Sequence, residues 1–367
     1  MSCDLLTLAT KGVAGLQPYS GGKPIEELQR ELGLDEIIKL ASNENPLGPS
    51  QKVLDAIAST TDLSRYPDGN GFSLKKALSE KHNISPDCIT LGNGSNDVLE
   101  MTARAFVTPE HQVIYAQHSF AVYPIVTQAV GAEHVVVPAT EWGHDLPAML
   151  DAISDKTKLI FVANPNNPTG SWLNKNDLRN FVENVPEHII VLIDEAYFEY
   201  AITEENYPDC SLWLDEFPNL IVTRTFSKAY GLAGLRVGYS LSHPDVANLL
   251  NRVRQPFNNN SLALVAAETA LHDEDYIKHS VEVNHTGMKQ LMLAFDDMGL
   301  EFIPSKGNFI CVDFEQPADD IYHSLLESGV IVRPIANYGM PNHLRVSIGT
   351  EEENTRFINE LGKILSK

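Results

Sequence analysis

One short segment of this 367-residue chain combines residue types that could do covalent chemistry. Residues 225–236 have the sequence TFSKAYGLAGLR, in which Lys228 follows Ser227 and lies eight positions before Arg236. A lysine that forms a Schiff base needs space around its amine, and the small neighbours leave that space. A phosphate group needs a hydroxyl donor and a fixed cation, which Ser227 and Arg236 could supply. These are the needs of pyridoxal phosphate, although a polar turn before a helix is an equal alternative for this segment taken alone.

An acidic residue follows a fully apolar run earlier in the chain. Ile189–Ile193 is predicted to be a buried strand, and Asp194 comes directly after it. A carboxylate there loses hydration and needs a cationic partner, for which a protonated pyridine nitrogen is suitable. That pairing lets the ring accept the electrons of a cleaved C–H bond. Tyr197 could then bond the phenolic oxygen of the ring, whereas Asp194 considered alone could be a helix N-cap.

Two restrained loops follow predicted strands. Residues 91–97 have the sequence LGNGSND, where glycines let the backbone close on a phosphate and the next helix offers free amides. A plain strand-to-helix turn is an equally good interpretation of that loop. Residues 164–170, NPNNPTG, come directly after the predicted strand Lys158–Ala163, at the end of a strand where α/β sheets bind ligands. Asn167 is therefore expected to donate its amide to a phenolic oxygen, with an ordinary turn as the weaker alternative.

Two aromatic residues are further candidates. Phe120 follows the predicted strand Gln112–Tyr115 and could stack on a cofactor ring, with a core phenylalanine as the alternative. Tyr66 lies in RYPDGNG, a polar turn over residues 65–71 that precedes the helical run Leu74–Lys81. A tyrosine in such a loop usually directs its hydroxyl outward, which predicts a partner or a ligand for it.

The elements that position these residues alternate between strand and helix patterns. Helical period covers Asp97–Phe106, Tyr123–Ala129 and Lys175–Asn184, between the predicted strands Cys88–Leu91, Gln112–Tyr115, His134–Val137, Lys158–Ala163, Ile189–Ile193, Leu220–Thr223 and Arg236–Ser240. This alternation predicts an α/β fold with a mainly parallel, doubly wound sheet, and we assign residues 41–258 to this large, cofactor-binding domain.

The two ends of the chain differ from this pattern. A helical pattern runs from about Asp245 to Leu271 and is broken near Pro256. Residues 259–367 predict a smaller α+β domain, with helices near 275–298, 317–328 and 351–365 and strands near 309–314, 330–333 and 343–348. Residues 1–40 contain prolines and glycines between positions 18 and 24, and they predict an arm that leads into a short helix and joins the small domain.

Composition narrows the function classes. The formal charge of −22 argues against nucleic acid or an anionic membrane as a partner. No apolar run reaches membrane-spanning length, and the first residues predict no signal peptide. The four cysteines, at positions 3, 88, 210 and 311, are far apart, which favours a cytoplasmic location. The 12 histidines are dispersed without ligand spacing, so no functional metal site is expected.

Together these segments resemble the fold-type-I pyridoxal-phosphate aminotransferases of class II over nearly the whole chain. Within that superfamily the sequence is most similar to the histidinol-phosphate aminotransferase family. The motifs that carry the likeness are Leu16–Pro24 (LQPYSGGKP), Leu40–Gly48 (LASNENPLG), the Tyr66 turn, the Asn164 loop, the Asp194 strand, the Lys228 segment, Val332–Pro334 and Leu344–Ser347. The resemblance implies an aspartate-aminotransferase-like large domain and a small domain.

The resemblance also implies a role for each matching residue. Lys228 is expected to hold the cofactor and to carry the proton, while Asp194 pairs with the pyridine nitrogen. Tyr197 and Asn167 are expected to bond the phenolic oxygen. The expected phosphate ligands are Gly94, Ser95, Asn96, Ser227 and Arg236. Many relatives carry tyrosine where this chain has Phe120, so stacking is kept there and a hydrogen bond is lost.

Substrate contacts and assembly follow from the same resemblance. Tyr66 is expected to reach the cofactor phosphate of the partner subunit, which implies a homodimer with shared active sites. Arg345 matches the arginine that binds the anionic end of the substrate, and Asn43 is a further expected substrate contact. Arg333 and Tyr19 resemble the added phosphate contacts of the family.

The implied reaction is a two-step amino transfer in histidine biosynthesis. L-Glutamate gives up its amino group and leaves as 2-oxoglutarate, and imidazole-acetol phosphate leaves as L-histidinol phosphate. An aromatic amino-acid aminotransferase is the main alternative, because its substrates would also present an anion to Arg345. A threonine-phosphate decarboxylase is a further alternative. A non-catalytic regulatory module would need a DNA-binding or partner domain, for which the chain has no spare length.

Overall fold

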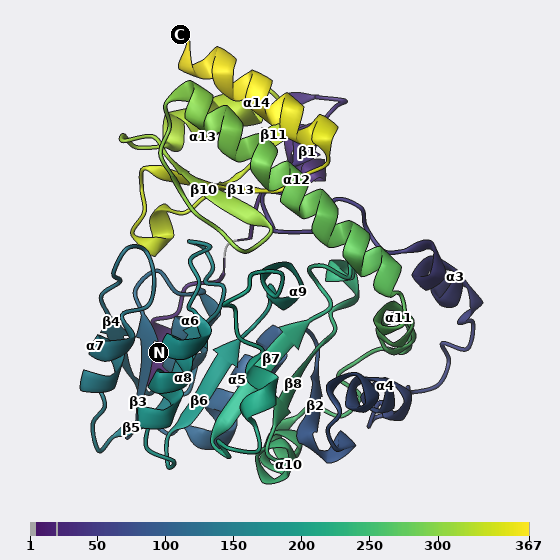
Figure 1. Cartoon of the computed structure of the whole chain (residues 1–367), viewed down its shortest axis with the longest axis vertical. Helices are drawn as coiled ribbons and strands as arrows, with labels where there is room; N and C mark the ends of the chain where they lie inside the picture. Colours follow the sequence, from purple (N-terminus) through teal and green to yellow (C-terminus); the bar gives the residue numbers. More distant parts are fainter. Residues whose placement is uncertain (1–4, 20, 367) are drawn as a thin grey trace.

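A seven-stranded sheet lies at the centre of the larger of two units in the computed structural model, which describes residues 5–19 and 21–366 (Figure 1). Cys3, Ser20 and the extreme ends of the arm and of the small domain lie outside the described residues. The strand order is β2-β8-β7-β6-β5-β3-β4, and every strand except β8 runs parallel to the others. The strands are β2 Ile89–Gly92, β3 Gln112–Ala116, β4 Glu133–Val137, β5 Thr157–Ala163, β6 Ile190–Asp194, β7 Leu220–Thr225 and β8 Gly238–Ser242.

Helices cover both faces of this sheet, as the alternation of strands and helices predicts. Strand β5 shows why, because Leu159 and Phe161 pack into one apolar cluster while Ile160 and Val162 pack into the other. One cluster includes helices α5 Ser95–Phe106, α6 Val122–Ala129 and α10 Pro244–Val253. The other includes α3 Gln51–Ser59, α4 Phe72–His82, α7 Leu146–Asp151, α8 Lys175–Asn184 and α11 Ser261–Leu271. The α/β fold with a mainly parallel doubly wound sheet is thus confirmed.

The smaller unit packs helices on an antiparallel sheet of order β12-β13-β10-β9. Its strands are β9 Phe302–Ile303, β10 Phe309–Asp313, β12 Arg333–Pro334 and β13 His343–Ser347, and its helices are α12 Glu274–Met298, α13 Asp319–Glu327 and α14 Glu351–Leu365. Helix α14 begins with a capping box, in which Thr350 and Glu353 bond each other's backbone amide. Helix α12 spans the small unit and reaches the edge of the large unit beside α11 (Figure 1), and so links the two.

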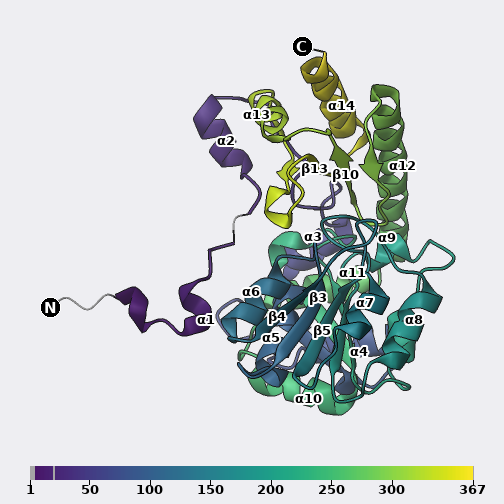
Figure 2. The same cartoon turned by 90° about the vertical axis from the view of Figure 1, so that its left-hand side faces the viewer.

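The amino-terminal arm contacts both units. Its first part holds the 3-10 helix η1 Leu5–Leu8 and helix α1 Lys11–Ala14, which packs against α6 (Figure 2). Helix α2 Ile25–Leu32 buries Leu28 beside Leu326 of the small unit. Strand β1 Ile38–Lys39 pairs in parallel with β11 Val330–Ile331. The predicted division of the chain at residues 40 and 258 stays a prediction, and helix α11 beyond it packs on α3 and α4.

The structure corrects one local prediction. The expected strand Arg236–Ser240 begins two residues later, at Gly238, because Arg236 adopts a left-handed conformation with φ of 56°. The expected break near Pro256 is present as the loop between α10 and α11. None of the helices in the described part of the chain combines the length and the apolar character needed to span a bilayer.

Candidate active site

A cavity of about 200 Å³ lies where the carboxyl ends of the parallel strands face the small unit. Thirteen of the predicted site residues line it: Tyr19, Asn43, Ser95, Asn96, Phe120, Asn167, Asp194, Tyr197, Ser227, Lys228, Arg236, Arg333 and Arg345. Because parallel strands end at the same edge of a sheet, residues at or after the ends of β2, β3, β5, β6 and β7 converge there. Gly94 lies beside the cavity against Arg236, and Tyr66 lies elsewhere.

Lys228 is partly buried, and its amine lies against the segment that crosses from the arm into the large unit. Its Nζ atom donates to the carbonyl oxygens of Ser42 at 3.2 Å and Asn43 at 3.1 Å. Burial, together with repulsion from Arg345 and Arg236, lowers the pKa of Lys228 to about 7. An amine with that pKa is partly neutral at neutral pH, and a neutral amine is the form that attacks an aldehyde or accepts a proton.

Asp194, the last residue of β6, is a buried carboxylate held by two hydroxyl groups. Tyr123 donates to its Oδ2 atom at 3.0 Å, and Thr223 of β7 donates to its Oδ1 atom at 3.1 Å. Burial raises the pKa of Asp194, while these two hydrogen bonds and the nearby amine of Lys228 act in the opposite direction. The carboxylate therefore favours a cationic partner in the cavity.

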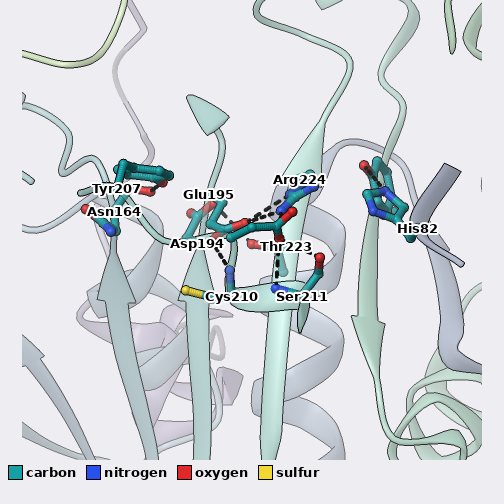
Figure 3. A network of polar contacts seen from close by, with 11 residues as sticks. His82, Asn164, Asp194, Glu195, Tyr207, Cys210, Ser211, Thr223 and Arg224 are labelled. Carbon is teal, nitrogen blue, oxygen red and sulfur yellow. Dashed lines mark hydrogen bonds and ion pairs between the residues drawn. The ribbon is translucent and has the colours of Figure 1, made fainter. Parts of the chain in front are cut away.

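The residues that follow Asp194 and Thr223, which are Glu195 and Arg224, form an ion pair with each other. Glu195, fully buried, accepts from Arg224 at 2.7 and 2.9 Å, and Arg224 also reaches Asp209 at 2.6 Å. Figure 3 shows this ion pair at the ends of neighbouring strands, close to Thr223 and Asp194. The backbone amide of Glu195 also donates to the carbonyl of Thr223. Strands β6 and β7 are thus joined by the Thr223–Asp194 hydrogen bond and by the Arg224–Glu195 ion pair, which together fix the position of Asp194.

A chain of amide and hydroxyl contacts crosses the cavity from β13 to Tyr197. Arg345 donates to Oδ1 of Asn167 at 2.6 Å, and Asn167 donates from its amide nitrogen to the Tyr197 hydroxyl at 3.1 Å. Asn43 donates to the same hydroxyl at 2.9 Å, and its Oδ1 atom accepts from Ser347. Burial raises the pKa of Tyr197 to about 12, so its hydroxyl keeps the proton that it can give to a phenolic oxygen.

The opposite end of the cavity offers donors for an anion. Arg236 donates to the Ser227 hydroxyl at 3.0 Å, and its left-handed backbone directs the guanidinium toward Gly94 and the start of α5. Gly94 has φ of 82°, and a Cβ atom there would overlap that guanidinium. Ser95 and Asn96 stand in the first turn of α5, whose free amides and dipole favour a phosphate.

Cationic residues of the small unit line the other side of the cavity. Arg345 is buried, and its Nε atom lacks a hydrogen-bond partner among the described residues. Arg333 lies with its guanidinium 6.0 Å from the centre of the Tyr19 ring. Anion binding by Arg345 is therefore compatible with its contacts to Asn167 and Ala41, because a guanidinium has five donors.

Tyr66 does not join the cavity of its own chain. Its side chain is 81% exposed and stacks on Phe257 with ring centres 4.5 Å apart. The structure thus separates Tyr66 from the other predicted site residues of the same chain.

Other residues around the site were not predicted from the sequence. Tyr123 and Thr223 hold Asp194, Arg224 pairs with Glu195, and Tyr338 lines the cavity. Thr223 and Arg224 sit in the apolar strand LIVTRT, where polar side chains inside a buried strand are a usable signal. Tyr123 lies in a helix of ordinary apolar pattern, which carries no such signal.

The donor set fits pyridoxal phosphate at each of its functional groups. The α5 terminus with Ser227 and Arg236 fits the phosphate, and the carboxylate of Asp194 fits a pyridine N–H. Tyr197 and Asn167 fit the phenolic oxygen, and the low pKa of Lys228 fits imine formation. No group of three or more metal-binding side chains is gathered within the described residues.

Comparison with known proteins agrees with this geometry. Residues 35–361 match the family model for aminotransferase class I and II. The histidinol-phosphate aminotransferase 2 of Pseudomonas fluorescens is 58% identical over 370 residues, covering 100% of both chains. This chain belongs to the histidinol-phosphate aminotransferase family. The histidinol-phosphate aminotransferase of Sinorhizobium meliloti, solved in complex with pyridoxal-5′-phosphate, superposes with a TM-score of 0.89 at 29% identity, covering 98% of this chain and 97% of that one.

A Thermus thermophilus aspartate aminotransferase mutant shares the fold, with a TM-score of 0.84 and 21% identity, covering 97% of this chain and 99% of that one. The histidinol-phosphate aminotransferase family therefore builds its site here on an aspartate-aminotransferase-like scaffold, and the protein is an enzyme of that family.

Proposed function

We propose that this enzyme interconverts L-histidinol phosphate plus 2-oxoglutarate and imidazole-acetol phosphate plus L-glutamate, in histidine biosynthesis, with pyridoxal 5′-phosphate as cofactor. One observation carries the proposal: a single cavity is lined by Lys228 and Asp194 on the sheet side and by Arg345 and Arg333 on the side of the small unit. The names of its full-length relatives support the same reaction.

The chain's own residues supply binding, orientation and proton transfer. When bound, the cofactor provides the electron sink for a cleaved C–H bond. The carboxylate of Asp194, whose charged form is favoured by two hydroxyl donors, would keep a ring nitrogen protonated. The Nζ atom of Lys228, with a pKa of about 7, can take the α-proton of the amino donor and return a proton to the acceptor.

Attachment of the cofactor has a direct test. Borohydride reduction of the holoenzyme, followed by peptide mass spectrometry, should find the cofactor on the peptide that contains Lys228. The Lys228→Ala variant should lose both the label and the turnover, whereas Lys306→Ala, which removes an ion pair to Glu204, serves as the control. A labelled peptide in Lys228→Ala would show that another lysine is the attachment point.

The anionic groups of the two substrates differ, and so do the cationic residues available to them. Arg345 can bind the carboxylate of glutamate or the phosphate of histidinol phosphate, since a planar guanidinium suits both. Arg333 and Tyr19 lie together at the same cavity and could add contacts to a phosphate. Within the strongly acidic chain, such arginines concentrate positive charge where an anion must enter.

The active unit is proposed to be a homodimer in which Tyr66 serves the partner's site. Support comes from its exposed ring, which lies outside the cavity of its own chain beside Phe257. A role in histidine biosynthesis also favours a cytoplasmic location.

A substrate panel tests the proposed reaction. Histidinol phosphate, phenylalanine, tyrosine and threonine phosphate would each be assayed with 2-oxoglutarate for formation of glutamate and for release of CO₂. We expect histidinol phosphate to have the highest kcat/KM. A higher kcat/KM for phenylalanine or tyrosine would replace the proposal with an aromatic aminotransferase, and CO₂ release from threonine phosphate would replace it with a decarboxylase.

A further inference from the structure

Tyr123 lies at a junction between two groups that would contact opposite parts of the cofactor ring. Its hydroxyl donates to Asp194, the predicted partner of the ring nitrogen, at 3.0 Å. Its ring meets the ring of Phe120, the predicted stacking residue, edge to face at 6.0 Å and 88°. Tyr123 also lines the cavity and has no exposed surface. The Tyr123 side chain therefore contacts both Phe120, which is expected to stack on the cofactor ring, and Asp194, which is expected to bond the nitrogen of that ring.

The position of the Tyr123 ring is fixed by packing. The ring stacks face to face on Phe161 of β5, with centres 4.6 Å apart and planes within 2°. Its backbone amide donates to the carbonyl of Phe120, and its carbonyl accepts from Thr127 at 2.8 Å. A ring held in this way loses little further rotamer freedom when its hydroxyl forms a hydrogen bond. The hydroxyl is thus already aimed at the carboxylate before any ligand binds.

The hydroxyl can act on Asp194 only as a donor. Burial and the neighbouring carboxylate raise the pKa of Tyr123 well above its usual value, so the phenol keeps its proton. An ionised carboxylate has about four lone-pair sites on two oxygens. Tyr123 and Thr223 occupy one site on each oxygen, which leaves acceptor capacity for a ring N–H. Both bonds stabilise the charged carboxylate against the cost of burial.

We propose that Tyr123 is a positioning residue for amino transfer, which together with Thr223 fixes the orientation and charge of Asp194 and aligns Phe120 over the same ring. The proposal rests on the proposed cofactor site and adds to it a pair of hydroxyl groups outside the direct cofactor contacts. Position 120 has no hydroxyl in this chain, and the hydroxyl of Tyr123 donates to Asp194.

The test compares variants in which a side chain loses its hydroxyl but keeps nearly the same shape. Tyr123→Phe and Thr223→Val each remove one donor to Asp194, and the double variant removes both. Tyr115→Phe is the matched control. Tyr115 is also a buried tyrosine in the same apolar cluster as Tyr123, but its hydroxyl bonds His134 at 2.7 Å and it does not line the cavity. Thr223→Val keeps the assignment testable should Tyr123→Phe fold poorly, and circular dichroism of each variant checks the fold.

Two measurements separate positioning from plain structural support. The first is the ¹⁵N chemical shift of the ring nitrogen in enzyme loaded with ¹⁵N-labelled cofactor, which reports its protonation independently of turnover. The second is the single-turnover rate with glutamate and with α-deuterated glutamate. We expect Tyr123→Phe to lower the protonated fraction and to slow the half-reaction by about tenfold or more, as the loss of a hydrogen bond to a charged group implies, with a larger deuterium isotope effect.

The outcomes are distinct. The double variant should approach Asp194→Asn in both measurements. If Tyr123→Phe and Thr223→Val match Tyr115→Phe in the nitrogen shift, the positioning role is wrong, even if their rates fall. If wild-type enzyme instead fails to bind the cofactor or to react with glutamate, the proposed function itself fails, and the two failures cannot be confused.

Discussion

Arg345 and Asn167 are hydrogen-bonded across the cavity, with 2.6 Å between Nη1 and Oδ1. Arg345 is the expected anchor for the substrate anion, and Asn167 is an expected donor to the phenolic oxygen of the cofactor. The amide of Asn167 in turn bonds the Tyr197 hydroxyl at 3.1 Å. Since an amide group is rigid, a change at the arginine changes where Asn167 points its amino group. The expected anchor of the substrate anion and an expected contact of the cofactor are therefore linked through one side chain.

The two arginines of the small unit that line the cavity, Arg333 and Arg345, should behave differently when removed. Arg345→Ala should impair both half-reactions, because both substrates present an anion to it and because Asn167 loses its partner. Arg333→Ala and Tyr19→Phe should mainly raise the KM for histidinol phosphate, by roughly ten- to a hundredfold for Arg333, as expected for a lost contact to a charged group. Measuring each half-reaction separately decides this, and equal losses for glutamate and histidinol phosphate in Arg333→Ala would contradict it.

Asp194→Asn should leave cofactor binding partly intact and lower the rate of proton transfer by orders of magnitude. The amide cannot hold a charged ring nitrogen, so the electron sink is weakened. Stopped-flow measurement of the glutamate half-reaction gives the rate, and equilibrium binding of cofactor to the apoenzyme gives the control. A single-turnover rate close to that of wild type would remove Asp194 from this role.

Lys228 should make the cofactor-free protein less stable at low pH. Its folded pKa of about 7 is lower than the usual lysine value, so the unfolded chain binds more protons between the two pKa values. The resulting cost is complete below about pH 7 and disappears as pH rises toward the unfolded value. Lys228→Met should therefore raise the apoenzyme Tm at pH 6 by roughly 5 °C, with the difference shrinking toward pH 10. Thermal unfolding across this pH range tests it, and a difference that does not change with pH would contradict it.

Shared active sites can be tested by mixing two inactive variants. Tyr66→Phe and Lys228→Ala subunits, once re-associated, should form one site with both residues intact and regain part of the activity. The Tyr66→Phe parent must itself be clearly impaired, and subunit exchange should be verified by native mass spectrometry. Exchange without recovery would place Tyr66 outside the partner's site.

The ion pair between Arg224 and Glu195 should matter most when only one partner is removed. Arg224→Met leaves the fully buried carboxylate of Glu195 unpaired and should cost about 3–5 kcal/mol of unfolding free energy. The double variant Arg224→Met with Glu195→Gln should recover part of that loss. Arg179→Met, which breaks a surface pair with Glu216, should cost no more than about 1 kcal/mol. Equal costs for both arginines in denaturant unfolding would disprove the difference.

Much of this architecture can be predicted from the sequence because its signals are local. Lys175–Asn184 has a clear helical period. Strands β5 and β6 contain the apolar runs 159–163 and 190–193, so the residues at their ends, including Asp194, can be placed at one edge of the sheet. The position of Tyr123 could not, because its hydroxyl meets a carboxylate 71 residues away. The sequence pattern wrongly predicts a strand at Arg236, since nothing local marks a left-handed conformation at an arginine.

The segment that crosses from the arm into the large unit at Asn43 bears on the order in which the parts of the active site can form during synthesis. The backbone amide of Asn43 bonds the Ser347 hydroxyl, a partner 304 residues later. The last strand of the large sheet ends at Ser242, so that sheet and its lysine can be in place while β13 is still inside the ribosome. A chain that stops before β13 would carry Lys228 and Asp194 yet lack Arg345 and Ser347. The expected anchor for the substrate anion is therefore completed only when nearly the whole polypeptide has emerged.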